Sequence, residues 1–260
     1  MTKVSNIRIQ QIRNATIIIE YAGQRILVDP MLGEKGSMPP FSMSIRQDHR
    51  NPLNDLPIVL EDVLKDIDVV LLTHLHEDHI DEKAYEVIPK TMRMLVQDEK
   101  DKAIVEAHGF TQVEVVGDHT YIGKTKVEKA ESQHGYFPMY IVAGHTTGYV
   151  LSQPNEKTLY HAGDTIWYSG VKRNLAKFQP EVITLNAGGN KFHVGGRVIM
   201  NDEDVVKVMQ TIPNAQVFVT HLEGVNHNHV TRAMVNRRLK ETGLAHRAFV
   251  PQDGEIIAIS

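Results

Sequence analysis

One short stretch constrains this 260-residue chain more than any other. Residues 73–79 read Thr-His-Leu-His-Glu-Asp-His and follow residues 69–72, a run of apolar, β-forming residues. Side chains two residues apart in an extended chain point to the same side, so His74 and His76 can reach one ion together. Imidazole nitrogens and carboxylate oxygens are the ligands that bind zinc and similar divalent ions. The stretch therefore predicts a metal site at a strand end, with the Asp-His pair that follows placed to serve a second ion. The alternative is a solvated polar loop.

Composition narrows the chemistry of such a site. The chain has no cysteine, so disulfides and thiolate ligands are excluded and any metal must use nitrogen and oxygen ligands. The formal net charge is −4, and the basic residues are spread rather than clustered, which argues against nucleic acid as a partner. No segment has the apolar length of a membrane-spanning helix, and the first eight residues lack the features of a secretory signal. We expect a cytoplasmic protein with no membrane contact.

Short β-forming runs and helical segments share the rest of the chain. Strands are expected at 7–12, 16–21, 25–28, 69–72, 94–96, 112–116, 121–122, 125–130, 140–143, 147–152, 158–161, 182–185, 216–219 and 255–259. Helices are expected at 59–65, 82–88, 98–108, 171–178, 201–211 and 230–240. The tight turns between the first three strands favour hairpins, and the later strand–helix–strand alternation favours crossovers onto a sheet. With no linker or repeat, residues 1–260 are predicted to form one domain with two sheets between helical layers.

Three further candidate ligands lie far apart in the chain, and each follows a predicted strand: His134, Asp164 and His221. Strand ends on one edge of a sandwich converge, so these side chains can join residues 73–79 in one cluster. Burying so many ionisable groups would be costly without a metal, whereas two divalent cations would neutralise the carboxylates and coordinate neutral imidazoles. A water bound to such an ion has its pKa lowered toward about 7, which indicates hydrolytic chemistry.

Several other residues have two possible roles. His227 and His229 compete with His221 for any metal. Asp29, at the end of the third predicted strand, either caps a turn or orients metal ligands by hydrogen bonding. The long segment 31–57 is interpreted as a flap that could cover a pocket or mediate an oligomer contact. Candidate substrate contacts, which are otherwise solvated surface residues, are Arg46, His49, Arg50, Lys191 and His193.

In their order along the chain, these motifs resemble those of the metallo-β-lactamase superfamily. The resemblance depends on Asp29, residues 73–79, His134, the Gly-Asp-Thr of residues 163–165, and His221. It implies an α/β fold, a four-layer αββα sandwich, with a binuclear centre of two divalent ions, zinc first and manganese or iron as alternatives. The length and the N-terminal strands look most like the ascorbate-6-phosphate lactonase-like branch. His161 and the flap have no counterpart in the expected pattern.

The same resemblance implies a role for each matching residue. His74, His76 and His134 would hold the first metal. Asp78, His79 and His221 would hold the second, Asp164 would bridge the two, and Asp29 would support them.

The leading hypothesis is a metal-dependent hydrolase that uses activated water on a small ester, lactone or phosphoester. Asp78 or Asp164 would move the proton, and His193 is a further catalytic candidate. Three alternatives remain: iron-dependent redox or oxygen chemistry in the same ligand set, a phosphodiesterase or nuclease acting on nucleic acid, and a metal-stabilised binding protein. The expected partner is a small-molecule substrate, and a homo-oligomer is left open.

Overall fold

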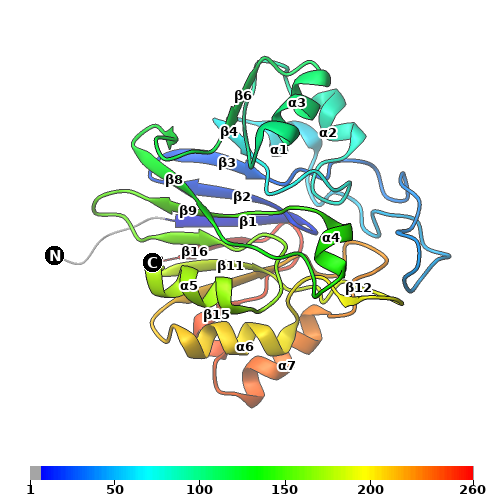
Figure 1. Ribbon diagram of the computed structural model, residues 1–260, viewed down its shortest axis with the longest axis vertical. Coiled ribbons are helices and arrows are strands. Elements are labelled where there is room, and N and C mark those ends of the chain that lie inside the picture. The colour runs from blue at the N-terminus through cyan, green and yellow to red at the C-terminus, as the bar shows by residue number, and fades with distance from the viewer. Residues whose placement is uncertain (1–6, 260) are drawn as a thin grey trace.

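Two seven-stranded sheets pack face to face at the centre of the computed structural model, which describes residues 7–259 (Figure 1). The first sheet has the order β16-β1-β2-β3-β4-β5-β6. Its strands are β1 (Ile7–Arg13), β2 (Thr16–Tyr21), β3 (Gln24–Val28), β4 (Val69–Leu71), β5 (Arg93–Val96), β6 (Gln112–Val115) and β16 (Ile256–Ile259). The second sheet has the order β15-β14-β11-β10-β9-β8-β7. Its strands are β7 (Tyr121–Ile122), β8 (Thr125–Ala130), β9 (Gly148–Ser152), β10 (Leu159–His161), β11 (Val182–Asn186), β14 (Gln216–Thr220) and β15 (Ala248–Phe249).

Helices cover the outer face of each sheet (Figure 1). The first sheet carries α1 (Leu60–Leu64), α2 (Glu82–Val87) and α3 (Glu99–Ala107). The second carries α5 (Ser169–Phe178), α6 (Asp202–Thr211) and α7 (Arg232–Glu241), followed by the 3-10 turn Ala245–Arg247. These are the four layers, αββα, that the sequence predicts. None of the helices within residues 7–259 is long and apolar enough to cross a membrane.

Both faces of each sheet are buried, and this explains why strands such as β2 are apolar along most of their length. In β2, Ile17 and Ile19 point into the core between the two sheets, while Ile18 points into the core beneath the helices of the first sheet. Neighbouring residues of a strand face opposite ways, so a strand covered on both sides reads as an unbroken apolar run. The same holds for the short parallel strand β4, which leads directly to the histidine-rich turn.

One predicted strand is wrong. Residues 140–143, expected to be a strand, lie in helix α4 (Met139–Ala143), at the end of the sandwich near the hairpin formed by β12 (Lys191–Phe192) and β13 (Gly196–Arg197) (Figure 1). Its residues Ile141 and Val142 are exposed. A β-branched run forms a strand only where a neighbouring strand offers its backbone, and none of the described strands pairs with this segment. The two-stranded sheet and β15 were not expected from the sequence.

Candidate metal centre

Loops at one edge of the sandwich bring the predicted ligands together. Residues 73–79 follow β4, His134 follows β8, Asp164 follows β10, and His221 follows β14. His221 holds a left-handed backbone conformation (φ 61°), and its N–H donates to the carbonyl of Asn14 at 2.9 Å. This conformation is unfavourable for a residue with a side chain, and such strain is concentrated at functional sites.

The first cluster consists of three imidazoles. Nδ1 of His76 lies 2.9 Å from Nε2 of His74 and 3.3 Å from Nε2 of His134. One nitrogen of each ring lies within 4.8 Å of the others, as ligands of a single ion must. This is the trio that the resemblance assigns to the first metal.

Hydrogen bonds on the far side of two of these rings fix where their protons are. His134 donates from Nδ1 to the carbonyl oxygen of Val198 at 3.0 Å, which leaves a lone pair on its Nε2. The hydroxyl of Thr73 donates to Asp29 at 2.7 Å and therefore accepts from Nδ1 of His74 at 3.0 Å. Both Nε2 lone pairs thus face Nδ1 of His76, where one proton could satisfy only one of them. A cation satisfies all three nitrogens at once, so these residues fit a metal ion.

The second cluster combines Asp78, His79 and His221. Nε2 of His221 lies 3.3 Å from a carboxylate oxygen of Asp78. His79 donates from Nδ1 to Asp29 at 2.8 Å, so its Nε2 is free to bind a metal. Among residues 7–259, Nε2 of His79 and both ring nitrogens of His221 are buried without a hydrogen-bond partner. Buried polar atoms are rarely left unpaired unless they serve a ligand, which again fits a metal.

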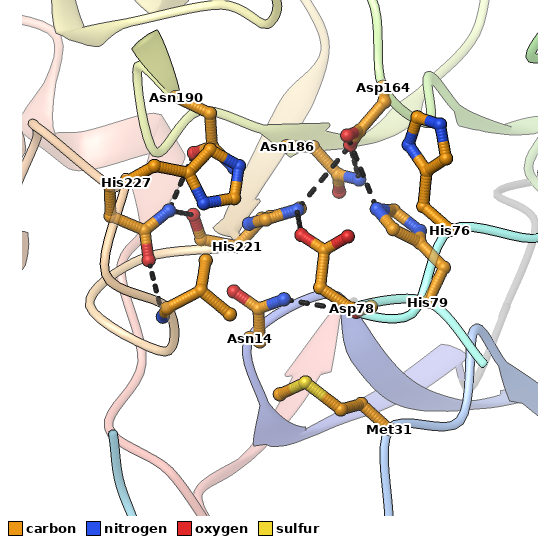
Figure 2. A network of polar contacts seen from close by, with 12 residues as sticks. Asn14, Met31, His76, Asp78, His79, Asp164, Asn186, Asn190, His221 and His227 are labelled. Carbon is orange, nitrogen blue, oxygen red and sulfur yellow. Dashed lines mark hydrogen bonds and ion pairs between the residues drawn. The ribbon is translucent and has the colours of Figure 1, made fainter. Parts of the chain in front are cut away.

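Asp164 lies between the two clusters (Figure 2). Its carboxylate is 3.2 Å from Nε2 of His79, 3.7 Å from Nε2 of His221 and 3.6 Å from Nε2 of His134. The amide of Asn186 donates to one of its oxygens at 2.7 Å and fixes the orientation of the carboxylate. This position is the one expected of a bridging ligand.

Electrostatics favour cations at this site. Burial, helped by His134, lowers the pKa of His76 to about 4 and keeps the ring neutral. Burial opposes the charge of Asp164, but His79 and His221 outweigh it and hold the pKa of that carboxyl well below its ordinary value. Burial would likewise lower the pKa of His79, yet Asp164 and Asp29 raise it well above the ordinary value. The buried carboxylates therefore attract positive charge at the positions where metal ions would sit.

A pocket of about 500 Å³ opens onto both clusters. Its polar lining comes from the candidate site: His76, Glu77, Asp78, His134, Asp164 and His227. The rest of the lining is mostly apolar and comes from residue 75, the flap, α4 and the region of β12: Phe41, Ser42, Met43, Leu75, Met139, Val142, Ala143, Phe192, Val194 and Val198. The flap thus contributes to the wall of a pocket, and its role in an oligomer contact stays a prediction.

Other predicted contacts lie elsewhere. His193 is exposed, its N–H donates to the carbonyl of Met43 at 2.7 Å, and it is outside the pocket lining, so its catalytic role stays a prediction without a supporting contact. Arg46 donates to the carbonyl of Asn226 at 3.0 Å, and Arg50 donates to the carbonyl of Gly36. Their guanidinium groups thus bind backbone within the protein.

The remaining substrate candidates and one unexpected histidine can also be placed. Lys191 and His229 are exposed, and His49 pairs with Asp48 on the surface. His161, which had no expected role, lies beneath the site with its Nε2 4.0 Å from Asp29 and its Nδ1 2.6 Å from the hydroxyl of Thr184.

Comparison with known proteins gives four consistent likenesses. The family described as "Beta-lactamase superfamily domain" matches residues 8–221. The UPF0173 protein YddR of Bacillus subtilis is 41% identical over 248 residues, which cover 95% of this chain and 98% of the relative. A crystal structure of an isothiocyanate hydrolase from Delia radicum gut bacteria superposes with a TM-score of 0.93 at 37% identity, covering 97% of this chain and 99% of that one. A crystal structure of a possible metal-dependent hydrolase from Veillonella parvula superposes with a TM-score of 0.94 at 30% identity, covering 98% of this chain and 100% of that one.

Proposed function

Because this chain belongs to the beta-lactamase superfamily and to the UPF0173 family of metal-dependent hydrolases, we propose that it hydrolyses a small, uncharged substrate with an electrophilic carbon at a binuclear metal site. Zinc is the ion we propose, although manganese and iron accept the same nitrogen and oxygen ligands. The candidate substrates are isothiocyanates, by likeness to the gut-bacterial hydrolase, and esters and lactones. The ascorbate-6-phosphate lactonase-like assignment has no further support.

The observation that carries this proposal is the apolar pocket directly above the ligand cluster. Among its described lining residues there is neither Lys nor Arg, and Phe41, Met139 and Phe192 supply much of the wall. A phosphoester or a nucleic acid would find no protein cation to pair with its charge, whereas a neutral organic group is favoured by burial against such a wall. The lining therefore narrows the predicted substrates to neutral molecules.

The residues of the chain divide the chemistry among them. His74, His76, His134, Asp78, His79, His221 and Asp164 would hold two metal ions, which when bound supply hydroxide from water near neutral pH and polarise the substrate. The apolar wall orients the organic group so that its electrophilic carbon faces the cluster. Asp78 and Asp164 line the pocket, and their carboxylates can take the proton that water loses. Addition of water to an isothiocyanate then gives a thiocarbamate, which releases carbonyl sulfide and the amine.

The test compares neutral and anionic probes on the purified protein. We expect turnover of phenethyl isothiocyanate, 4-nitrophenyl acetate or a γ-lactone, and little turnover of bis(4-nitrophenyl) phosphate. Dialysis against a chelator should abolish activity, and added zinc should restore it. Elemental analysis with an absorption spectrum separates zinc from iron, and therefore hydrolysis from the redox alternative.

Single substitutions connect activity to the cluster. His134→Ala should abolish both metal content and turnover, because it removes one of three imidazoles from the first group. His246→Ala is the control, since His246 is exposed and lies outside the pocket. Full activity in metal-free protein, or faster turnover of the phosphodiester than of every neutral probe, would contradict the proposal.

A further inference from the structure

His227 is a buried histidine of the pocket wall that belongs to neither metal-ligand group. It lies in the loop between β14 and α7, and only 5% of it is exposed. Its ring packs edge-on against Phe41, with ring centres 4.6 Å apart, and stacks on Phe192 at 5.4 Å. In Figure 2 the ring lies beside Asn190, next to His221. The two aromatic neighbours therefore hold the imidazole in a fixed orientation at the pocket.

A chain of amide hydrogen bonds fixes which ring nitrogen of His227 carries the proton. The chain starts at the backbone: Val225 N–H donates to Oδ1 of Asn228 at 3.0 Å, and Nδ2 of Asn228 donates to the carbonyl of His221 at 3.3 Å. These two partners leave only one orientation for the amide of Asn228. Its Nδ2 also donates to Oδ1 of Asn190 at 2.6 Å, which orients that amide in turn. Nδ2 of Asn190 then donates to Nε2 of His227 at 3.0 Å.

The consequence is that Nε2 of His227 accepts a hydrogen bond, so the neutral ring carries its proton on Nδ1. Within residues 7–259 this Nδ1 is buried and has no hydrogen-bond partner. A buried donor left unpaired destabilises the fold, so its retention calls for a function. A metal ligand needs a lone pair at that atom, and therefore the hydrogen-bond pattern removes His227 as a competitor of His221. His229 is exposed, which removes the other competitor.

We propose that His227 is a catalytic residue whose Nδ1–H donates a hydrogen bond to the substrate atom that becomes negatively charged as water adds. The proposal rests on the hydrolase function given above and extends it. The oxygen of water forms a bond to the electrophilic carbon, its proton passes to a carboxylate of the site, and the π electron pair moves onto the nitrogen, sulfur or oxygen of the substrate. His227 stabilises that charge and keeps its own proton, while Asn190 acts as a positioning residue.

The surroundings of His227 make such a donor effective. Phe41 and Phe192 exclude water from two sides of the ring. In a site with little water, a preorganised donor aimed at developing charge is worth much more than in solution, and removing one commonly lowers kcat roughly 10²–10³-fold. Because the charge develops only during the reaction, the effect falls on kcat more than on KM.

Two variants and one control test the proposal, with phenethyl isothiocyanate or 4-nitrophenyl acetate as the probe. His227→Phe removes the donor but preserves the aromatic packing, and should lower kcat about 100-fold with KM and metal content nearly unchanged. Asn190→Asp leaves the imidazole in place but offers its Nε2 an acceptor, so the ring proton moves to Nε2 and kcat should fall similarly. His229→Phe, two residues along the same loop and outside the pocket lining, should keep the wild-type kcat.

A second readout does not depend on turnover. Long-range ¹H–¹⁵N NMR of the histidine side chains should show His227 as the Nδ1–H tautomer in the wild type and as the Nε2–H tautomer in Asn190→Asp. An Nε2–H tautomer in the wild type, or full kcat in His227→Phe, would overturn the proposal. If the wild type turned over none of the probes, the proposed function would fail, while the tautomer measured by NMR would still decide the hydrogen-bond assignment.

Discussion

Replacing Asp29 with Asn would change one atom and disturb both metal groups. Asp29 is fully buried at the end of β3 and accepts three hydrogen bonds. Its Oδ1 accepts from the backbone N–H of Thr73 at 2.8 Å. Its Oδ2 accepts from the hydroxyl of Thr73 at 2.7 Å and from Nδ1 of His79 at 2.8 Å. The carboxylate therefore sets the proton position of His79 directly and that of His74 through Thr73.

Asparagine has one acceptor where aspartate has two. If its oxygen stays on the backbone N–H of Thr73, its NH₂ group faces two other donors, the threonine hydroxyl and Nδ1 of His79. The imidazole can relieve this conflict by moving its proton to Nε2, the atom that lies 3.2 Å from Asp164. That atom then has no lone pair for a metal. The hydroxyl must turn as well, which weakens its hold on His74.

The expected magnitude follows from these two effects. Loss of an outer hydrogen-bond partner typically weakens metal binding 10–100-fold. His79 contacts Asp29 directly, so we expect a loss of about 100-fold, or about 2.7 kcal/mol, for the second metal group. His74 is affected through one intervening residue, so we expect a loss of about 10-fold for the first group.

Zinc titration of metal-free protein against a competing chelator, with elemental analysis of the product, measures both losses. Asp48→Asn is the matched control, because Asp48 pairs with Nδ1 of His49 at 2.9 Å on the surface, away from the site. Circular dichroism should show the same fold for all three proteins. If Asp29→Asn bound two ions as tightly as the wild type, the proton assignments of His74 and His79 would be wrong.

Three further predictions concern the bound metal, a buried arginine and the wall of the pocket. Compared with protein at a free zinc concentration 100 times the Kd of each site, chelator-treated protein should unfold with a free energy lower by about 2.7 kcal/mol for each ion removed, and its Tm should recover on adding zinc. Arg13→Met should lower the free energy of unfolding in urea by about 3 kcal/mol, because the buried guanidinium donates to the carbonyls of Met31 and Gly33 at 2.7 and 2.8 Å. Arg8→Leu is the control: it lies at an exposed position of the same strand and should lower the free energy of unfolding by less than about 1 kcal/mol. Phe192→Ala should raise KM for an apolar probe about tenfold by removing a pocket wall, and an unchanged KM would place the substrate elsewhere.

Local sequence indicates which candidate ligands the fold brings together, because residue type and position after a strand are both visible in the sequence. Residues 73–79 carry four candidate ligands within one turn, and the apolar run before them is a buried strand. His134, Asp164 and His221 could be chosen in the same way, since each follows a strand that ends at the same edge of the sandwich. What the structure adds is their mutual distances and the groups that orient them.

The sequence fails where a role depends on which way a loop side chain faces. Residue type makes His193 a catalytic candidate, yet the neighbouring Phe192 lines the pocket and His193 is exposed. Phe192 is the last residue of β12 and His193 lies in the turn that follows it, so the fold of the hairpin decides which of the two side chains faces the pocket. Nothing in the local sequence indicates that Asn190 and Asn228, 38 residues apart, meet and orient His227. That information exists only in the folded chain.

One side chain connects the pocket wall to the loop that carries His227. Asn226 accepts from the backbone N–H of Phe41 at 2.9 Å, and its own amide donates to the hydroxyl of Ser44 at 2.9 Å. Its backbone N–H donates to Asn51 at 2.8 Å, at the far end of the flap. The flap is thus held by the residue that immediately precedes His227. Because Phe41 lines the pocket and also packs on His227, the flap that would select the substrate also fixes the donor that would act on it. A change of substrate preference by mutation in the flap should therefore rarely leave the reaction rate untouched, since the selecting surface and the imidazole share the same hydrogen-bonded support.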